Sequence, residues 1–408
     1  MKPVLTVTPQ PFMEDAGLKA VMAALGHGNA LMVGGCVRGA ILGEAGGDID
    51  IATVLTPNAA TKALESAGIK VVPTGLAHGT VTAVAGGKGY EITTLRRDVE
   101  TDGRRAVVAF TTDWAEDAQR RDFTMNTLLM NLDGQVFDPT GQGVSDLQNG
   151  VVRFVGDAAM RIAEDSLRIL RFFRFYARYG KGEPDAEGLK ASAALAKNIE
   201  NLSRERITHE VERMLPHPQA GAAITAMQKI GIMQDFWFSD FNQSVYECLR
   251  GYVVSRAPEA VFPTLFSYSV WENKADLMDA KIKKYIVLSN AKKFQLHKAV
   301  LFVHEHTDSV FKNVYTYGKT ITLAGGLLHS SINAKGADTG AYEVLHEKLQ
   351  SVRVLEMPLK AADLMRELGV AQGPQLGTLL KKVEGWWLDQ EGVPDHTKCL
   401  QYAKSIAA

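Results

Sequence analysis

The segment Asp48-Ile49-Asp50-Ile51-Ala52-Thr53 has the alternating polar and apolar pattern of a β-strand. Successive side chains of a strand point to opposite faces, so Asp48 and Asp50 would share one face while the isoleucines enter the core. Two neighbouring carboxylates repel each other, and a cation between them relieves the repulsion. A few hard oxygen ligands of this kind suit Mg²⁺ bound together with substrate phosphates. The pair therefore predicts a magnesium site, although a solvated acidic edge strand would show the same pattern.

A second motif, upstream of this strand, is typical of a phosphate-binding turn. Residues 31–33 read as a strand, Gly34 and Gly35 as a tight turn, and the residues up to Arg38 as the start of a helix. Backbone N–H groups at a helix N-terminus bind anions, and an arginine can hold a phosphate at two points. A tight turn with a surface arginine is the alternative reading. Together with the aspartate pair, however, the turn favours a site at which metal and triphosphate meet.

The first 140 residues are expected to form a mixed α/β domain, and the rest of the chain to be helical. The expected strands are Ala30–Val33, Asp48–Ala52, Thr80–Val84, Tyr90–Leu95, Arg105–Phe110 and Gln135–Phe137, with helices over Pro57–Gly68 and Asp113–Met130. On the strand Tyr90–Leu95, Glu91 is a third carboxylate that either reaches the metal or pairs with an arginine. Further along, Asp157 and Gly180 would bound one long helix. The fold class predicted from this pattern is α+β.

One face of that long helix carries alternating charges. Arg161, Asp165, Arg168 and Arg171 are spaced to share approximately one side, while Ile162, Ile169, Leu170 and Phe173 supply a buried side. A ladder of ordinary salt bridges has the same spacing. Nucleobase recognition is the alternative reading. An ionised Asp only accepts hydrogen bonds and an Arg only donates them. Asp165 on the exocyclic amine and Arg168 on the ring nitrogen would therefore accept C and A and reject G and U.

Composition sets limits on the class of protein. The chain has 408 residues, 46% of them hydrophobic, with a net charge of −1 and a pI near 6.8, which argues against a strongly basic, nonspecific nucleic-acid binder. Its three cysteines form no CxxC pair, so neither a disulfide framework nor a zinc site is indicated and a reducing cytoplasm fits. We expect no membrane span and no signal peptide. No obligate protein partner is evident.

Read together, these motifs resemble those of the class II tRNA nucleotidyltransferases, within the DNA polymerase β superfamily. Arg120-Arg121-Asp122-Phe123-Thr124-Met125-Asn126 is similar to the family's ribose and triphosphate motif, and residues 164–171 are similar to its nucleobase-template motif. Ser203-Arg204-Glu205-Arg206-Ile207 resembles a later helix start, and Asp102-Gly103-Arg104-Arg105 lies where the family has a flexible loop. The specific resemblance covers roughly residues 30–215. One departure is Gly39, where the family usually has Asp, so a carboxylate that could orient Arg38 is missing.

The resemblance implies a nucleotidyltransferase head over residues 1–140, a helical neck with a nucleobase-recognition helix over 141–215, and an all-α, RNA-binding body and tail over 216–408. It implies template-independent addition of C, C and A to tRNA from CTP and ATP, with two Mg²⁺ ions and release of pyrophosphate. Asp48, Asp50 and Glu91 would be catalytic, the first two as metal ligands. The nucleotide would contact Gly34, Gly35, Arg38, Arg121, Asp122, Asn126, Asp165, Arg168 and Arg171.

Several alternatives stay open at this stage. Bacterial poly(A) polymerases share most of the motifs but tend to carry a basic extension, and enzymes that add only CC or only A are further rivals. A non-catalytic RNA-binding protein with the same fold is a more remote alternative. RNA contacts are expected at Lys283, Lys284, Lys292 and Lys293, within a stretch that also holds Lys281 and Lys298, and at Lys381 and Lys382. A lysine-rich solvated surface would show the same pattern.

Overall fold

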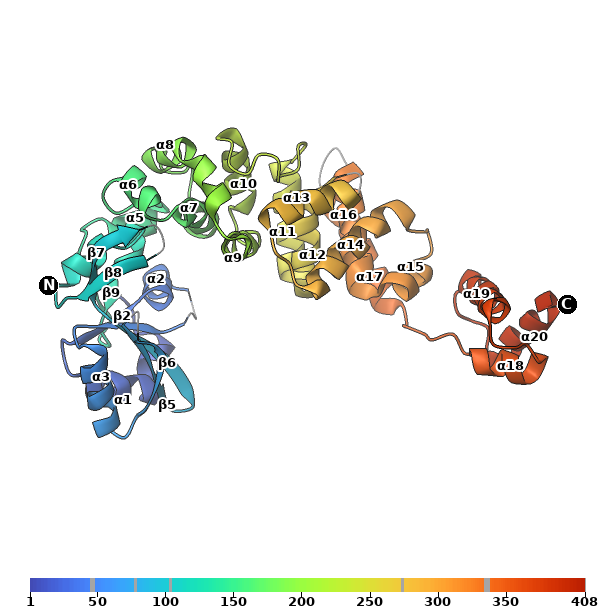
Figure 1. Ribbon diagram of the computed structural model, residues 1–408, viewed down its shortest axis with the longest axis horizontal. Helices are drawn as coiled ribbons and strands as arrows, with labels where there is room; N and C mark the ends of the chain where they lie inside the picture. Colours follow the sequence, from blue (N-terminus) through green and yellow to red (C-terminus); the bar gives the residue numbers. More distant parts are fainter. Residues whose placement is uncertain (45–47, 77–78, 103–104, 273–274, 334–337, 408) are drawn as a thin grey trace. The chain divides into compact units, whose positions relative to one another are not determined.

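The computed structural model describes residues 1–44, 48–76, 79–102, 105–272, 275–333 and 338–407. They fall into two compact units, Met1–Gln234 and Asp235–Ala408. Unit 1 begins with a mixed sheet and continues as helices, whereas the regular structure described in unit 2 is helical (Figure 1). This arrangement confirms the α+β class predicted from the sequence.

The main sheet of unit 1 has eight described strands in the order β1-β10-β9-β2-β3-β6-β5-β4. The strands are β1 (Leu5–Thr6), β2 (Ala30–Val33), β3 (Asp50–Thr53), β4 (Lys70–Gly75), β5 (Thr80–Ala85), β6 (Lys88–Thr94), β9 (Leu129–Met130) and β10 (Gln135–Phe137). A separate hairpin is formed by β7 (Arg96–Asp102) and β8 (Arg105–Phe110). The sheet is mixed because β3 and β6 run parallel while its other paired strands are antiparallel.

Register at the centre of the sheet places the acidic residues together. Val33 at the end of β2 pairs with Asp50, and Asp50 pairs with Glu91 of β6 on its other side. The next residues inward, Met32, Ile51 and Ile92, are buried and fix this register, since a shift by one residue would expose them. Asp48 comes just before the strand rather than within it, so the expectation of a strand beginning at Asp48 was wrong by two positions.

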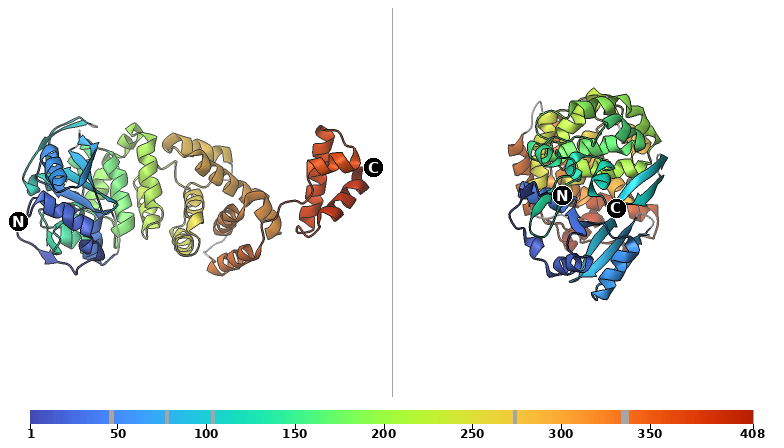
Figure 2. Two further views of the ribbon diagram at one scale, coloured as in Figure 1. Left: turned by 90° about the horizontal axis from the view of Figure 1, so that it is seen from below. Right: turned by 90° about the vertical axis from the view of Figure 1, so that its left-hand side faces the viewer.

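The helices of unit 1 cover the sheet and then continue beyond it, as the green ribbons in Figure 2 show. They are α1 (Ala16–Leu25), α2 (Gly35–Leu42), α3 (Pro57–Ser66), α4 (Trp114–Gln119), α5 (Gly143–Asn149), α6 (Ala158–Glu164), α7 (Leu167–Tyr179), α8 (Ala186–Ala194), α9 (Arg204–Met214) and α10 (Ala220–Lys229). Short 3₁₀ helices are η1 (Pro11–Glu14), η3 (Thr124–Asn126) and η4 (Ala196–Asn201).

Two helices expected from the sequence are interrupted. The expected helix over Asp113–Met130 ends at Gln119 and is followed by a turn, η3 and β9. The expected helix from Asp157 to Gly180 breaks at Asp165, whose backbone is extended, and restarts as α7. The apolar side was predicted correctly, because Ile162, Ile169, Leu170 and Phe173 are all buried. Apolar periodicity therefore located the buried face but not the break in the backbone.

Unit 2 is described as helices throughout. They are α11 (Gln243–Arg256), η5 (Pro258–Ala260), α12 (Val261–Ser269), α13 (Ala275–Tyr285), α14 (Asn290–Glu305), α15 (Val310–Tyr317), α16 (Lys319–Asn333), α17 (Thr339–Ser351), α18 (Ala361–Leu368), α19 (Pro374–Asp389) and α20 (His396–Ala407). A core around Trp387 and Leu364 joins α18–α20 to Phe311 of α15. Among the described residues, no helix has the length and apolar content that crossing a bilayer requires.

Candidate active site

A cleft of about 670 Å³ lies in unit 1, at the ends of β2 and β3. One wall comes from the sheet and the turn before η3, and the other from α7 and α9. All the residues predicted to bind metal or nucleotide line this cleft: Gly34, Gly35, Arg38, Asp48, Asp50, Glu91, Arg121, Asp122, Asn126, Asp165, Arg168 and Arg171. Segments far apart in the sequence therefore meet in one place, while the role of each residue stays a prediction.

Three carboxylates face the cleft from the sheet. Asp50 and Glu91 are register partners on adjacent strands, and Asp48 lies just before β3. Burial, then the neighbouring Glu91 and Asp48 carboxylates, raise the pKa of Asp50 to about 6, although Arg38 and Arg121 act in the opposite direction. Repulsion of this kind is what a divalent cation would relieve, and the donors are all oxygen, as Mg²⁺ prefers.

The carboxylates do not form a complete metal cage. Within the part of the chain that the structure describes, no three His, Cys, Asp or Glu side chains converge as a fully protein-bound ion would require. Mg²⁺ usually keeps water and substrate phosphates among its ligands and takes only one or two carboxylates from the protein. The acidic group thus fits Mg²⁺ that binds together with a nucleotide, and does not fit a metal held by protein alone.

Gly34 makes the approach of β2 to the carboxylates possible. Its φ is +77°, a conformation that L side chains rarely adopt, and a Cβ there would lie 3.0 Å from Oδ2 of Asp50. The next residue, Gly35, starts α2 and would meet no atom within 4 Å if it carried a Cβ. The glycine turn therefore brings a helix N-terminus beside the acidic group, as an anion site would need.

Arg38 is held without a neighbouring carboxylate on its own helix. Its Nη1 donates to Oδ1 of Asn126 at 2.6 Å and its Nε donates to the hydroxyl of Tyr179 at 3.2 Å. The guanidinium also lies over the rings of Phe175 and Tyr179. Gly39 is buried and α2 continues through it to Leu42. The positioning that the family's Asp would supply at residue 39 is thus supplied here by α7 and η3.

Asp117 is a cleft residue that the sequence reasoning missed. Although burial alone would raise its pKa, the Arg121 and Arg120 guanidiniums outweigh burial and hold the pKa of this carboxyl below its usual range. It accepts from both arginines, with Nη2 atoms at 2.6 Å for Arg120 and 2.9 Å for Arg121. The only signal in the sequence was the spacing of three and four residues from Asp117 to the two arginines, within a segment expected to be one helix.

Asp122 and Asn126 lie in the turn and η3, not on a helix as expected. Asp122 accepts from the Asn126 amide at 2.7 Å and from Nε of Arg171 on α7 at 2.7 Å. With the bond from Arg38 to Asn126, this makes a chain of contacts from α2 through the turn to α7. A continuous helix would have pointed Asp122 and Asn126 in nearly the same direction but could not have bridged two helices in this way.

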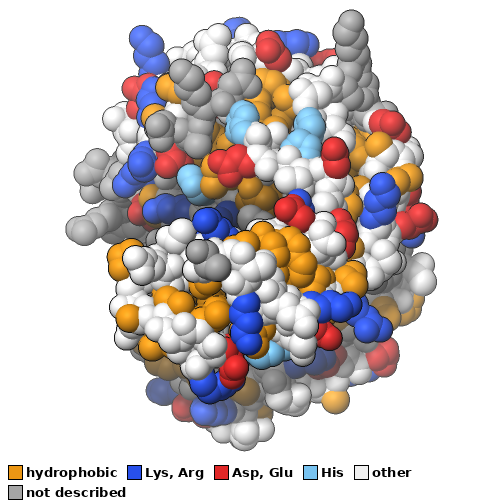
Figure 3. Space-filling model, turned by 90° about the vertical axis from the view of Figure 1, so that its right-hand side faces the viewer, with side chains coloured by type: hydrophobic (Ala, Val, Ile, Leu, Met, Phe, Trp, Pro, Cys, Tyr) orange, Lys and Arg blue, Asp and Glu red, His pale blue; other side chains and the backbone are white. Residues whose placement is uncertain are grey.

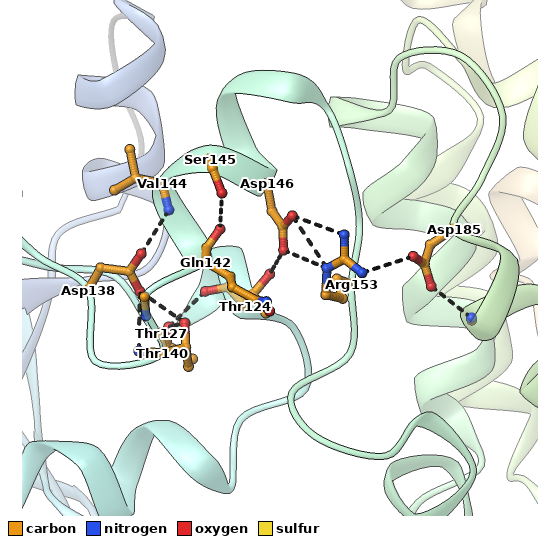
Figure 4. Close-up of polar contacts among 12 residues, drawn as sticks. Thr124, Thr127, Asp138, Thr140, Gln142, Val144, Ser145, Asp146, Arg153 and Asp185 are labelled. Carbon is orange, nitrogen blue, oxygen red and sulfur yellow. Dashed lines mark hydrogen bonds and ion pairs between the residues drawn. The ribbon is translucent and has the colours of Figure 1, made fainter.

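The back of the same turn is fixed by a second polar network, drawn in Figure 4. Thr124 of η3 donates to Oδ2 of Asp146 on α5 at 2.7 Å, and Asp146 accepts from Nε of Arg153 at 3.1 Å. Arg153 also pairs with Asp185, the N-cap of α8, at 3.5 Å. These contacts join η3 to α5 and to the start of α8.

Asp165 and Arg168 both line the cleft, but each has a partner within the protein. Asp165 accepts from Nη2 of Arg206 on α9 at 2.6 Å and, through Oδ1, from the backbone N–H of Leu167 at 3.1 Å. Arg168 pairs with Glu164 and donates to the carbonyl oxygen of Arg161 at 2.9 Å. The break at Asp165 means that the shared helical face expected for Arg161, Asp165, Arg168 and Arg171 does not exist. Asp165, Arg168 and Arg171 nevertheless all line the cleft.

The expected RNA-binding lysines lie in unit 2. Lys283 and Lys284 are on α13, where Lys284 pairs with Asp235 at 2.6 Å and Lys283 lies 3.9 Å from Asp279. On α14, Lys292 lies over the ring of Phe262, and Lys293 is exposed. On the face drawn in Figure 3, Lys and Arg side chains are interspersed with Asp and Glu. RNA binding by these lysines stays a prediction.

One predicted segment cannot be placed. Gly103 and Arg104, in the expected flexible loop Asp102-Gly103-Arg104-Arg105, lie outside the described residues. The backbone on either side of the loop forms the hairpin of β7 and β8.

Two family models match the chain. Residues 30–153 match the model described as Poly A polymerase head domain, and residues 183–237 match the one described as Probable RNA and SrmB- binding site of polymerase A. The first match runs from β2 through α5, and the second spans α8, α9 and α10.

Curated relatives match over most of their length. The mitochondrial CCA tRNA nucleotidyltransferase 1 of Danio rerio is 34% identical over 367 residues, which cover 87% of this chain and 82% of that protein. A CCA-adding enzyme of Leuconostoc mesenteroides is 29% identical over 415 residues, with 98% of each chain covered. Among solved structures, the CCA-adding enzyme of Bacillus stearothermophilus in complex with CTP has a TM-score of 0.73 at 24% identity and covers 92% of this chain and 93% of its own. The Thermotoga maritima CCA-adding enzyme complexed with tRNA has a TM-score of 0.63 at 18% identity, with 93% and 92% covered.

Proposed function

The chain belongs to the family of CCA tRNA nucleotidyltransferases, and from this premise we propose that its cleft adds C, C and A to the 3′ end of tRNA. The observation that carries the proposal is the meeting of two different sites in one cleft. The Asp50 and Glu91 carboxylates lie beside a glycine turn, and the Asp165 and Arg168 pair lies on the opposite wall. The first site suits a metal-bound triphosphate and the second suits the pairing edge of a base.

Asp48 and Asp50, assisted by Glu91, would hold the Mg²⁺ ions. When bound, these ions would lower the pKa of the RNA 3′-hydroxyl and neutralise charge on the triphosphate and the leaving pyrophosphate. Arg38, Arg121 and the N–H groups at Gly34 and Gly35 bind the phosphates. The 3′-oxygen attacks the α-phosphorus in line, so a new P–O bond forms while the bond to pyrophosphate breaks. Positioning and charge neutralisation supply most of the rate.

Base selection rests on Asp165 and Arg168. Cytosine and adenine each present an amine donor beside a ring acceptor, which matches a carboxylate beside a guanidinium. Guanine and uracil present the reverse order and would leave buried polar groups mismatched, at a cost of several kcal/mol. In the free enzyme, the Arg206 and Glu164 partners hold both side chains in the cleft until a base arrives.

We also propose the three-part organisation inferred from the motifs: a catalytic head over residues 1–140, a helical neck over 141–215, and an RNA-binding body and tail over 216–408. A cytoplasmic location is part of the proposal. It is supported by three free cysteines, Cys36, Cys248 and Cys399, two of them buried.

Incubation with tRNA that lacks its terminal CCA, in the presence of Mg²⁺ and of CTP and ATP separately and together, tests the proposal. We expect two additions with CTP alone, and three with CTP and ATP together, resolved on a sequencing gel. A long ladder of A would identify a poly(A) polymerase instead. A stop after CC, or addition of A only to tRNA ending in CC, would identify a partial enzyme.

A further inference from the structure

The helices α7 and α9 pack side by side in parallel, and charged side chains form successive rungs between them. Near their starts, Asp165 pairs with Arg206 at 2.6 Å. Near their middles, Glu210 pairs with Arg174 and lies 3.9 Å from Arg171. Each of these rungs combines acid and base.

Beyond these ion pairs, the last turn of each helix carries an arginine that lines the cleft. Arg178 lies in the final turn of α7 and Arg213 in the final turn of α9, and both are exposed and line the cleft. Arg213 follows Glu210 by three residues, so both lie on approximately the same face of α9, the face that Glu210 turns toward Arg174 of α7. Beyond the last of these ion pairs, each helix thus contributes one arginine to the cleft.

Neither arginine is strongly neutralised. Among the described residues, the hydrogen-bond partner of Arg213 is Nε2 of His209 at 3.1 Å, and no carboxylate pairs with it. Arg178 lies 3.7 Å from Glu44, and both of these side chains are about half exposed, so solvent weakens the pair. In contrast, Arg120, Arg121, Arg168, Arg171 and Arg206 of the same cleft each have a carboxylate partner within 3.0 Å. An anion is therefore the ligand that this end of the cleft lacks.

We propose that Arg178 and Arg213 bind the phosphodiester backbone of the 3′-terminal nucleotides of the tRNA as they enter the cleft. The inference rests on the proposed function, in which the cleft takes two anionic substrates. In that function, Arg38, Arg121 and the Mg²⁺ ions held by the carboxylates bind the triphosphate of the incoming nucleotide. Asp165 and Arg168 bind its base. The second anionic substrate is the RNA strand. The planar guanidinium group of an arginine can donate two hydrogen bonds to one of its phosphates.

Steady-state kinetics with varied tRNA and varied CTP test this assignment in the full-length protein. We expect Arg213→Gln to raise the KM for tRNA about 10-fold, with little change in the KM for CTP. Its apparent tRNA affinity should also depend less on salt, with the slope of log K against log salt falling by about 0.7 for one lost contact to a single strand. Arg178→Gln should act in the same direction, and Arg213→Lys should retain part of the affinity because it keeps the charge.

Lys19→Gln is the matched control, because Lys19 is an exposed cation on α1 that does not line the cleft. It should change neither KM. If wild-type protein adds CCA while Arg213→Gln and Arg178→Gln keep a normal KM for tRNA, the assignment is overturned and the proposed function stands. A rise in the KM for CTP alone would also overturn it, since the arginines would then bind the triphosphate. If the wild-type protein adds no nucleotide at all, the proposed function itself has failed.

Discussion

The Asp50 side chain is half-buried between two carboxylates and two arginines. A like-charged neighbour such as Glu91 costs stability unless a cation compensates it. The surrounding sheet enforces the arrangement, because burial of Ile51 and Ile92 fixes the register that places Asp50 opposite Glu91. The residue is thus held in a position that a bound cation would stabilise, and strongly perturbed carboxylates of this kind are typical of catalytic sites.

Asp50→Asn should lower nucleotide addition by about 10³-fold or more, because an amide is a poor ligand for Mg²⁺ and leaves the triphosphate charge less neutralised. The fold should be retained or slightly stabilised, since one of the repelling charges is gone. Incorporation of labelled CTP into tRNA lacking CCA and thermal unfolding would measure both effects. Asp133→Asn, an exposed change in the loop between β9 and β10, is the control. Normal turnover in Asp50→Asn would exclude the metal assignment.

Gly34→Ala should be destabilising and should impair catalysis. A methyl group at φ +77° costs about 1 kcal/mol or more, and it would lie 3.0 Å from Oδ2 of Asp50 and displace that carboxylate. Gly35→Ala keeps the backbone N–H and meets no atom within 4 Å, so it should change stability much less. Urea denaturation and kcat for CMP addition, measured on both variants, compare them. Equal effects of the two substitutions would contradict the role given to Gly34.

Asp165→Ala should relax discrimination against UTP and GTP, because the acceptor for the base amine is removed. Asp165 also pairs with Arg206 and accepts from the N–H of Leu167, so some loss of stability is expected too. Arg206→Ala separates the two effects, since it breaks the ion pair but keeps the carboxylate. The ratio of UTP and GTP incorporation to CTP and ATP incorporation should rise in Asp165→Ala and stay low in Arg206→Ala. Lower stability with unchanged selectivity in Asp165→Ala would refute the template role.

At the scale of elements, the sequence predicted the regular parts well and the interruptions poorly. The strands Ala30–Val33, Arg105–Phe110 and Gln135–Phe137 were predicted to the residue, because alternation and turn residues mark both ends. The breaks at Asp165 and after Gln119 were not predicted. Both segments keep helical spacing of apolar residues, and the contacts that favour the breaks are tertiary: Arg206 on Asp165, and Arg171 on Asp122.

The sequence singled out residues that line the cleft, but it did not indicate the contacts that these residues make with one another. Motif residues such as Arg38 and Asn126 were recognised one by one, yet nothing local indicates that Arg38 donates to Asn126 or stacks on Phe175 and Tyr179. Long-range partners of this kind depend on the packing of α7 against the head. Asp117 was missed although its partners are local, because a spacing of three and four residues to Arg120 and Arg121 is also that of an ordinary helical salt bridge.

Arg120 and Arg121, which directly follow α4, give a pH-dependent prediction through their ion pairs with Asp117. Asp117 is buried and has a lowered pKa in the folded protein, compared with about 3.9 when unfolded. Its contribution to stability is therefore fully present above about pH 4 and is lost as the pH falls through the lower folded value. Asp117→Asn should lower the free energy of unfolding by about 3 kcal/mol at pH 7. The difference from wild type should shrink at pH 3 in urea denaturation, and a constant difference would contradict the ion pair.

At the scale of the whole molecule, we expect catalysis and the contacts to the RNA 3′ end in unit 1, and further RNA contacts in unit 2. The cleft and all its predicted nucleotide contacts lie in unit 1, and the expected RNA-binding lysines lie in unit 2. A net charge of −1 provides no overall attraction to RNA, so binding must come from local groups. Which lysines contribute then depends on whether an acidic side chain already neutralises them.

Lys293 and Lys284 provide that comparison. Lys293 is exposed on α14 with no carboxylate partner among the described residues, whereas Lys284 pairs with Asp235 at 2.6 Å. Lys293→Ala should weaken tRNA binding and reduce the slope of log K against log salt by about 0.9, because one phosphate contact and its counterion release are lost. Lys284→Ala should have a smaller effect, since RNA must first compete with Asp235 for that lysine. Filter binding between 50 and 200 mM salt would measure both, with the exposed Lys62→Ala of α3 as a control. A wild-type slope in Lys293→Ala would show that Lys293 makes no contact to the RNA.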